Sequence, residues 1–336
     1  MIADAGKRYT LVPEETIPSK AKSVKSLTSF AKRSAQLAAG FVCAIALAAG
    51  VPTVAGAQVL TTDNVCGKTA DARGITAENL PDIDATNALV MGKDGTVYYG
   101  RGADEQVKIA SITKVMTAIL TVENCKMDEK VTVSNAAATV GNSTAGLLEG
   151  DELTVEQALR GLMIPSGNDA AIVLAEYVGK KIDPKTKDAE ATFVKAMNER
   201  AKKLGCTGTV FENPHGLDFD EWAGDMHSTA HDVALMMQEA MKNDTIREVV
   251  ASEDSWIEVT GADGADHSHS MDTHNYLLGQ DGNIGGKTGT TSAAGNCLIL
   301  LARDTSGNPY IAVILKSAER GILYTEMNAL LKQATS

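Results

Sequence analysis

Short β-type runs lie at both ends of the region from Ala88 to Lys332, and helical patterns fill its middle. Near its start, Asp94 and Gly95 separate two apolar runs, which indicates a hairpin. Helices are expected at 111–123, 154–163, 168–179, 189–204, 229–242 and 322–332. Strands are expected at 255–260, 268–274, 284–290, 296–303 and 309–316. The pattern predicts one α+β domain, an antiparallel sheet flanked by helices and built from both ends around a helical insertion.

The N-terminal 57 residues differ from the rest in composition. Basic residues precede an apolar run from Leu37 to Val51, and Ala55 and Ala57 fit the small-residue rule for signal cleavage. We expect a signal peptide at 1–57, a polar leader segment at 58–85 and the folded domain at 86–336. We expect a cleaved signal and not a membrane anchor, because the apolar run is shorter than the about 20 residues of a spanning helix. Membrane attachment is expected only if this signal stays uncleaved. Either case predicts an extracytoplasmic protein, secreted or associated with the cell wall.

Charge and size exclude some functional classes. The chain has 336 residues, 44% of them hydrophobic, and a formal net charge of -12. It is therefore long enough for a sizeable core, and a nucleic-acid partner is not expected because the basic footprint that binds phosphates is missing.

No metal or cofactor is expected from the cysteines and histidines. No C-x-x-C pair occurs, and His227 and His231, although spaced as i and i+4, lack the glutamate of an H-E-x-x-H motif. Loss of the signal would leave four cysteines, Cys66, Cys125, Cys206 and Cys297. Three disulfide connectivities are then possible, and Cys297, inside the apolar GNCLILLA, could equally be a core thiol.

A lysine interrupts the apolar stretch KIASITKVMTAIL at 108–120. Ser111 and Lys114 would share one face of a helix, with the hydroxyl near its positive N-terminal end. Desolvation and a second cation lower the pKa of a lysine, and a neutral lysine can take a proton from a serine. The pair is a candidate nucleophile and base. The spacing alone is weak evidence, because Ser19 and Lys22 repeat it in the signal region.

Two further stretches carry side chains suited to the same site. Residues 166–168, Ser-Gly-Asn, fall at a break between two apolar helical patterns, where polar side chains can point into a cleft. Residues 287–289, Lys-Thr-Gly, fall on an expected strand, where Gly289 would leave room for a ligand backbone. Together they offer a second hydroxyl, an amide and a second cation. Ser306 and Asn308 repeat the Ser-x-Asn spacing, but in a turn beyond the lysine strand.

The order of these stretches resembles that of the penicillin-recognising serine enzymes, with their S-x-x-K, S-x-N and K-T-G motifs. The sequence is most similar to the low-molecular-mass D-alanyl-D-alanine carboxypeptidases. The matching stretches are IASITKVMTA, GLMIPSGNDAA, FENPHGLD, STAHDVALMM and GGKTGTTSAAGNCL. The resemblance covers about residues 85 to 335 and implies a β-lactamase/transpeptidase-like fold and a DD-peptidase catalytic domain at 86–336.

The resemblance also implies catalytic roles. Ser111 would be acylated with Lys114 as its base, and Ser166 and Asn168 would complete the hydrogen-bonded cluster. Lys287 would keep Lys114 deprotonated and help to hold the substrate carboxylate.

Substrate binding would fall to the residues around this cluster. Thr288 would bind the carboxylate beside Gly289, and the backbone N–H groups of Ser111 and Thr290 would form the oxyanion hole. Relatives often have an arginine where this chain has His274, so Arg320 is the substitute candidate for the carboxylate.

The expected activity is removal of the terminal D-alanine from peptidoglycan stem peptides, with β-lactams as covalent inhibitors. Three alternatives share the motifs. A class A β-lactamase needs the glutamate of E-x-x-L-N, which does not occur between Asn168 and Lys287, so a bound drug is expected to persist. A non-catalytic penicillin-binding sensor would be acylated without turnover, and a DD-endopeptidase would use the same residues.

Overall fold

The computed structural model describes residues 63–75 and 79–335. The expected signal peptide, 1–57, and the start of the leader lie outside the described residues. The strands are β1 (Asn64–Val65), β2 (Lys68–Thr69), β3 (Asn87–Gly92), β4 (Val97–Arg101), β5 (Lys130–Thr132), β6 (Glu152–Thr154), β7 (Ser255–Thr260), β8 (Asp266–Met271), β9 (Asn283–Thr291), β10 (Gly295–Arg303) and β11 (Pro309–Ser317). The helices are α2 (Ala70–Arg73), α3 (Lys114–Asn124), α4 (Asn135–Thr139), α5 (Val155–Met163), α6 (Asn168–Ile182), α7 (Ala189–Leu204), α8 (Ala230–Ala240), α9 (Asp244–Val250) and α10 (Arg320–Thr335), with 3₁₀ turns η2 (Ala110–Thr113) and η3 (Asp220–Trp222).

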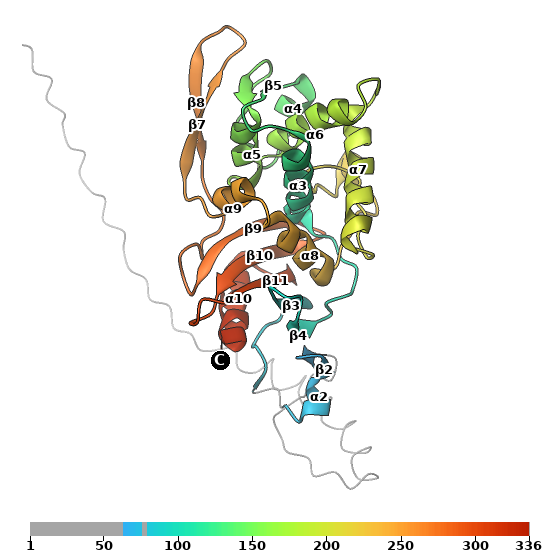
Figure 1. The fold of residues 1–336 in the computed structure, drawn as a ribbon, viewed down its shortest axis with the longest axis vertical. Coiled ribbons are helices and arrows are strands. Elements are labelled where there is room, and N and C mark those ends of the chain that lie inside the picture. The colour runs from blue at the N-terminus through green and yellow to red at the C-terminus, as the bar shows by residue number, and fades with distance from the viewer. Residues whose placement is uncertain (1–62, 76–78, 336) are drawn as a thin grey trace, which may run out of the picture. The chain divides into compact units, whose positions relative to one another are not determined.

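The large sheet joins both ends of the described chain. Its strand order is β2-β1-β4-β3-β11-β10-β9, and each neighbouring pair is antiparallel. In Figure 1 the orange-to-red strands β9 to β11 lie next to the teal β3. Strands β3 and β4 form the expected hairpin, with Gly95 at a φ of 83° in its turn. The predicted α+β architecture is confirmed, including a sheet assembled from both ends around a helical insertion.

Both faces of this sheet are covered, which explains the unbroken apolar run of β10. Ile299 and Leu301 belong to the large core cluster shared with the helical insertion. Leu298 and Leu300 belong to a second cluster, which includes Met327 of α10. Because successive strand side chains point to opposite faces, a run that is apolar at every position needs a partner on each face.

Helix α3 is the central helix of the insertion. All of its residues from Lys114 to Thr121 are buried, and α5, α6, α7 and α8 pack around it. Helix α5 begins with the expected capping box: the Thr154 side chain accepts the N–H of Gln157, and the Gln157 side chain accepts the N–H of Thr154. The lysine of the apolar stretch therefore lies in the most enclosed helix of the domain.

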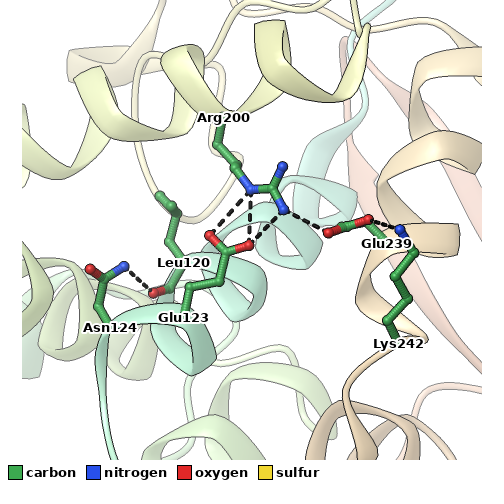
Figure 2. A network of polar contacts seen from close by, with 6 residues as sticks. All are labelled: Leu120, Glu123, Asn124, Arg200, Glu239 and Lys242. Atoms are coloured by element: carbon green, nitrogen blue, oxygen red, sulfur yellow. Dashed lines mark hydrogen bonds and ion pairs between the residues drawn. The ribbon is translucent and has the colours of Figure 1, made fainter.

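Arg200 of α7 ties three helices together through its guanidinium (Figure 2). It donates to Glu123 of α3 at 2.9 and 2.7 Å, and to Glu239 of α8 at 2.6 Å. Lys242 donates to the second oxygen of Glu239 at 2.5 Å. The Arg200 side chain is only 19% exposed, so water screens these charges incompletely. The planar guanidinium has several N–H donors and can therefore bind two carboxylates at once. Through Glu123 and Glu239 it holds α7 and α8 against the C-terminal end of α3.

The strands over 255–271 do not join the large sheet as the sequence pattern suggested. Strands β7 and β8 pair with each other, and β7 also pairs with β6, where Thr260 lies opposite Glu152. They belong to a second sheet of order β5-β6-β7-β8. Figure 1 shows this hairpin in orange beside the helices. A period of two identifies a strand but not its sheet, because the partner is set by contacts distant in sequence.

The sequence predicted a polar leader at 58–85 ahead of the folded domain, but residues 63–75 contain β1, β2 and α2. Strand β1 pairs with β4 and so extends the large sheet. Asp63, only 1% exposed, accepts hydrogen bonds from Arg101 at 2.8 Å and from the Tyr99 hydroxyl at 2.8 Å. The buried Asp63 carboxylate thus holds this polar segment against β4, a contact that the composition of the segment does not predict.

The four cysteines within the described residues are unpaired. Cys66, Cys125, Cys206 and Cys297 are all free thiols, so none of the three possible disulfide pairings is formed. Burial raises the pKa of the Cys297 thiol to about 12, as fits a core thiol. Among the described helices, none is both long enough and apolar enough to cross a membrane.

Replacing Asp63 with alanine should lower the free energy of unfolding by about 3 kcal/mol, because Arg101 would keep its mostly buried position without a carboxylate. Urea denaturation followed by circular dichroism measures this change. Glu199→Ala is the control, because the Lys195–Glu199 side chains are 78% and 57% exposed, and it should cost less than about 0.5 kcal/mol. Equal losses in the two variants would mean that the contacts of Asp63 with Arg101 and Tyr99 stabilise the domain no more than an exposed ion pair does.

Candidate active site

Ser111 lies in the 3₁₀ turn η2 and not in the α-helix that the sequence pattern predicted. Helix α3 begins at Lys114, so the hydroxyl sits just before the helix and the amine on its first residue. Ala110 has a φ of 48°, a left-handed conformation that strains a residue other than glycine. Ser111 is partly exposed, whereas Lys114 is 0% exposed. The hydroxyl is thus accessible from outside and the amine is not.

The Lys114 amine has three polar neighbours. Its Nζ lies 2.8 Å from Ser111 Oγ, 2.8 Å from Asn168 Oδ1 and 2.8 Å from the carbonyl oxygen of His215. The amide and carbonyl oxygens can only accept, so each takes one N–H from the amine. A neutral amine has two N–H groups and one lone pair, which leaves the lone pair for the hydroxyl of Ser111. An ammonium would donate to all three oxygens, whereas a neutral lysine would donate to two of them and accept a hydrogen bond from the serine.

The electrostatics of the site favour the neutral form of Lys114. Burial lowers the pKa of Lys114 well below its ordinary value, and the charge of Lys287 lowers it further, although Asp169 opposes the shift. Burial, with a smaller contribution from Arg320, lowers the pKa of Lys287 to about 7. The charge of Lys287 thus disfavours the charged form of Lys114.

Lys287 enters the site from the large sheet. It lies on β9, is 2% exposed, and its Nζ donates to Ser166 Oγ at 2.7 Å and to the carbonyl oxygen of Thr288 at 2.8 Å. The strand thus brings the second cation to the Ser-Gly-Asn segment, 121 residues earlier in the sequence. Two hydroxyl–amine pairs, Ser111 with Lys114 and Ser166 with Lys287, lie in the same site.

The Ser-Gly-Asn segment occupies the predicted break between α5 and α6. Ser166 has a φ of 65°, and Asn168 is the first residue of α6. A Cβ on Gly167 would lie 2.5 Å from Asp169 Oδ1 and 2.8 Å from the carbonyl oxygen of Gly161, so a larger residue would not fit without a shift. The tight turn aims the Asn168 amide oxygen at Lys114 while its Nδ2 donates to the backbone at 3.1 Å.

Gly216 and Gly289 bring two backbones against the turn that carries Ser111. A Cβ on Gly289 would lie 2.9 Å from the backbone nitrogen of Ser111, and one on Gly216 would lie 2.0 Å from the carbonyl oxygen of Ala110. We expected Gly289 to leave room for a ligand backbone. The structure gives a different reason: the turn itself fills that space, and β9 closes on it from one side.

Sequence reasoning assigned no role to His215 or Asp169. Asn213 Oδ1 accepts the N–H of His215 at 3.2 Å and that of Gly216 at 2.7 Å, which forms the turn that presents the His215 carbonyl to Lys114. Burial first, and Lys114 second, lower the pKa of the His215 ring to about 3, so the ring is neutral. The Asn-Pro-x-Gly pattern at 213–216 signals such a turn but not its partner.

The remaining candidates lie around this centre. Thr288 is 8% exposed, and Thr290 is exposed with its hydroxyl donating to Asn296 at 3.2 Å. Arg320 begins α10, is exposed, and lies over the Tyr276 ring at 5.3 Å. The pKa of His274 is lowered by burial, and then by Lys287 and Arg320. His274 and Arg320 are thus both close enough to Lys287 for their charges to act on each other.

Comparison with known proteins places this geometry in one family. The chain matches the D-alanyl-D-alanine carboxypeptidase family Peptidase_S11 over residues 74–319. The D-alanyl-D-alanine carboxypeptidase DacF of Bacillus subtilis is 33% identical over 255 residues, which cover 73% of this chain and 61% of that protein. The D-alanyl-D-alanine carboxypeptidase of Streptomyces sp. strain K15 is 34% identical over 275 residues, which cover 78% of this chain and 91% of that protein. The crystal structure of the Streptomyces K15 DD-transpeptidase has a TM-score of 0.70 and 31% identity, covering 76% of this chain and 98% of that one.

The matched region contains all three motif stretches and most of the large sheet. The match spans 61% of the Bacillus protein and 91% of the Streptomyces one. As its motifs predicted, the chain belongs to the D-alanyl-D-alanine carboxypeptidase family Peptidase_S11.

Proposed function

We propose that the protein is a serine-type D-Ala-D-Ala carboxypeptidase that removes the terminal D-alanine of peptidoglycan stem peptides through a Ser111 acyl-enzyme. The supporting observation is the surroundings of Lys114: burial and Lys287 lower its pKa, and in the neutral form two acceptors occupy its N–H groups while its lone pair is left for the Ser111 hydroxyl. The names of the relatives support the substrate class.

Acylation begins when Ser111 Oγ bonds to the carbonyl carbon of the penultimate D-alanine while Lys114 Nζ takes the hydroxyl proton. Collapse of the tetrahedral intermediate breaks the peptide bond, and the proton passes to the amine of the departing D-alanine. Water then attacks the ester in the same way and releases the shortened stem peptide. Ser166 and Asn168 hold the hydrogen-bonded cluster, and Lys287 keeps Lys114 neutral between proton transfers.

The oxyanion and the terminal carboxylate need separate partners. We assign the oxyanion to the backbone N–H groups of Ser111 and Thr290. The closeness of Gly289 to the Ser111 nitrogen supports this, because it brings the end of β9 beside the turn. The carboxylate is assigned to Lys287 with Thr288.

Arg320 supplies a further positive charge near this carboxylate subsite, where many relatives have an arginine in place of His274. Its effect on the pKa of Lys287 supports a position close enough to act on a bound anion. Gly289 serves the subsite by packing β9 against the Ser111 turn.

Peptidoglycan stem peptides and β-lactams are the proposed partners, and both acylate the same serine. The substrate places the enzyme outside the cytoplasm, in agreement with the N-terminal signal expected from the sequence. The similar Streptomyces K15 structure is that of a DD-transpeptidase, a type of enzyme that passes the acyl group to an amine, whereas the acceptor proposed here is water.

Ser111→Ala should abolish covalent labelling by a fluorescent penicillin, and Lys114→Ala should slow labelling by about 100-fold or more, because the proton acceptor is lost. Intact-protein mass spectrometry and gel fluorescence over time measure both effects. With the parent protein the adduct should persist, because E-x-x-L-N does not occur between Asn168 and Lys287.

Ser306→Ala is the matched control, because Ser306 belongs to the Ser-x-Asn copy in a surface turn and should label as the parent does. Labelling of Ser111→Ala at the parent rate would remove Ser111 from the mechanism. A peptide ending in D-Ala-D-Ala should release D-alanine with turnover. Labelling without release of D-alanine would favour the penicillin-binding sensor. Rapid loss of penicillin would favour a β-lactamase, and cleavage of cross-linked peptides alone would favour an endopeptidase.

Lys287→Gln should move the rise of the acylation rate to higher pH. Loss of the neighbouring positive charge makes protonation of Lys114 easier and raises its pKa, so its neutral form becomes dominant only at higher pH. The rate at pH 7 should fall at least about tenfold. Stopped-flow acylation from pH 5 to 10 measures the profile, with Lys195→Gln, whose side chain is 78% exposed, as control. An unmoved or lowered midpoint would contradict the electrostatic role of Lys287.

A further inference from the structure

Three side chains with metal-binding atoms meet outside the active site: Asp151, His267 and His269, named here the Asp–His–His cluster. Asp151 immediately precedes β6, and the two histidines alternate along β8. In the register of the hairpin they lie opposite Val259 and Ile257, which are both buried. Both histidines therefore lie on the inner face of the hairpin, where the His269 side chain is 13% exposed and that of His267 34%.

The spacing of the three ligand atoms suits a small cation. His267 Nε2 and His269 Nε2 lie 3.3 and 3.5 Å from the same oxygen, Asp151 Oδ2, and all three atoms are within 4.8 Å of one another. In a tetrahedral site with bonds of about 2.0–2.2 Å, the ligand atoms are about 3.4 Å apart. Two of the three separations already have this value, and the two rings are at 78° to each other, with centroids 4.9 Å apart.

The cluster is not satisfied by the protein alone. Both histidine Nε2 atoms are buried and have no hydrogen-bond partner. Asp151 is 1% exposed, and its Oδ2 accepts the N–H of Leu148 at 2.9 Å. Asp151 Oδ2 lies 3.3 and 3.5 Å from these nitrogens but forms no hydrogen bond with them, and a buried imidazole nitrogen without a hydrogen bond is unfavourable. A cation bound by all three atoms would compensate them together.

We propose that the Asp–His–His cluster binds one divalent transition-metal ion of the zinc type, with a water molecule as fourth ligand. Imidazole nitrogen with one carboxylate oxygen is a zinc donor set, whereas Ca²⁺ and Mg²⁺ take oxygen ligands. No metal site was expected from the sequence, so this proposal departs from that expectation. The His-x-His alternation on a strand is a local signal, but Asp151 lies far away in the sequence.

The site would brace one wall of the active site. Residues 141–151 connect Asp151 to the backbone that holds Asn168, whose Nδ2 donates to the carbonyl oxygen of Gly141 at 3.1 Å and whose N–H donates to Ser143 at 2.8 Å. Within that loop, a Cβ on Gly146 would be 3.1 Å from His269 Nδ1, so the loop already packs against the ring. A metal would link this loop to the β7–β8 hairpin.

The test titrates the full-length protein, stripped with EDTA and dialysed, with Zn²⁺ in a calorimeter and with Co²⁺ in a spectrophotometer. We expect one ion per chain and the strong visible absorption of tetrahedral Co²⁺. His267→Gln/His269→Gln should weaken binding at least about 100-fold, because two ligands are lost. His227→Gln/His231→Gln is the matched control, because it removes two histidines beside Asp225 and Asp104 and should bind as the parent does.

Thermal denaturation gives a readout independent of enzyme activity. Zn²⁺ should raise the melting temperature of the parent and of the control, but not that of the cluster variant. If the double variant does not fold, His267→Gln alone, at the more exposed of the two positions, should show the loss. The proposal is overturned if the parent binds no Zn²⁺, or if the cluster variant binds it as tightly as the parent, which would place the ion on the thiols or elsewhere.

Discussion

The structure depends on burying an amine without its charge. Lys114 is the first residue of a helix whose next two turns are buried, where an ammonium ion would be costly. Two acceptor oxygens, from Asn168 and from the His215 backbone, bind its N–H groups, and a second buried lysine disfavours its protonation. Each feature satisfies the amine and also leaves one lone pair beside a hydroxyl. The arrangement that makes burial tolerable is thus the one that makes the lysine a base.

Close backbone packing holds this arrangement in place. The turn before α3 has no side-chain cap, and it is held by two segments that approach it only because Gly216 and Gly289 have no Cβ. At the other end of α3, the guanidinium of Arg200 joins this helix to α7 and α8. A nucleophile held to within a few tenths of an ångström needs support at both ends of its helix, and the sheet supplies one end while the ion-pair network supplies the other.

The β7–β8 hairpin offers a contrast in how buried polar groups are satisfied. The Lys114 amine has three hydrogen-bond partners, all supplied by the chain. Around Asp151, two imidazole nitrogens are buried without one. This difference led us to propose an external ligand at the second cluster and none at the first. The loop between them, residues 141–151, joins the two sites physically, because its backbone holds Asn168 at one end and carries Asp151 at the other.

The sequence by itself determined the longer helices, the longer strands, the α+β architecture and the chemical groups of the candidate site, because periodicity, caps and motifs are local properties of the chain. It did not reveal the short helices α2, α4 and α9 or the short strands β1, β2, β5 and β6. Tertiary structure alone decided that β7 and β8 form a separate sheet, that Asp63 is buried against Arg101, and that Gly289 packs on a turn. It also decided that the third contact of Lys114 is a backbone carbonyl, at His215, which no residue type reveals. Such contacts join segments far apart in the chain, and a pattern read along the sequence carries no distance between them.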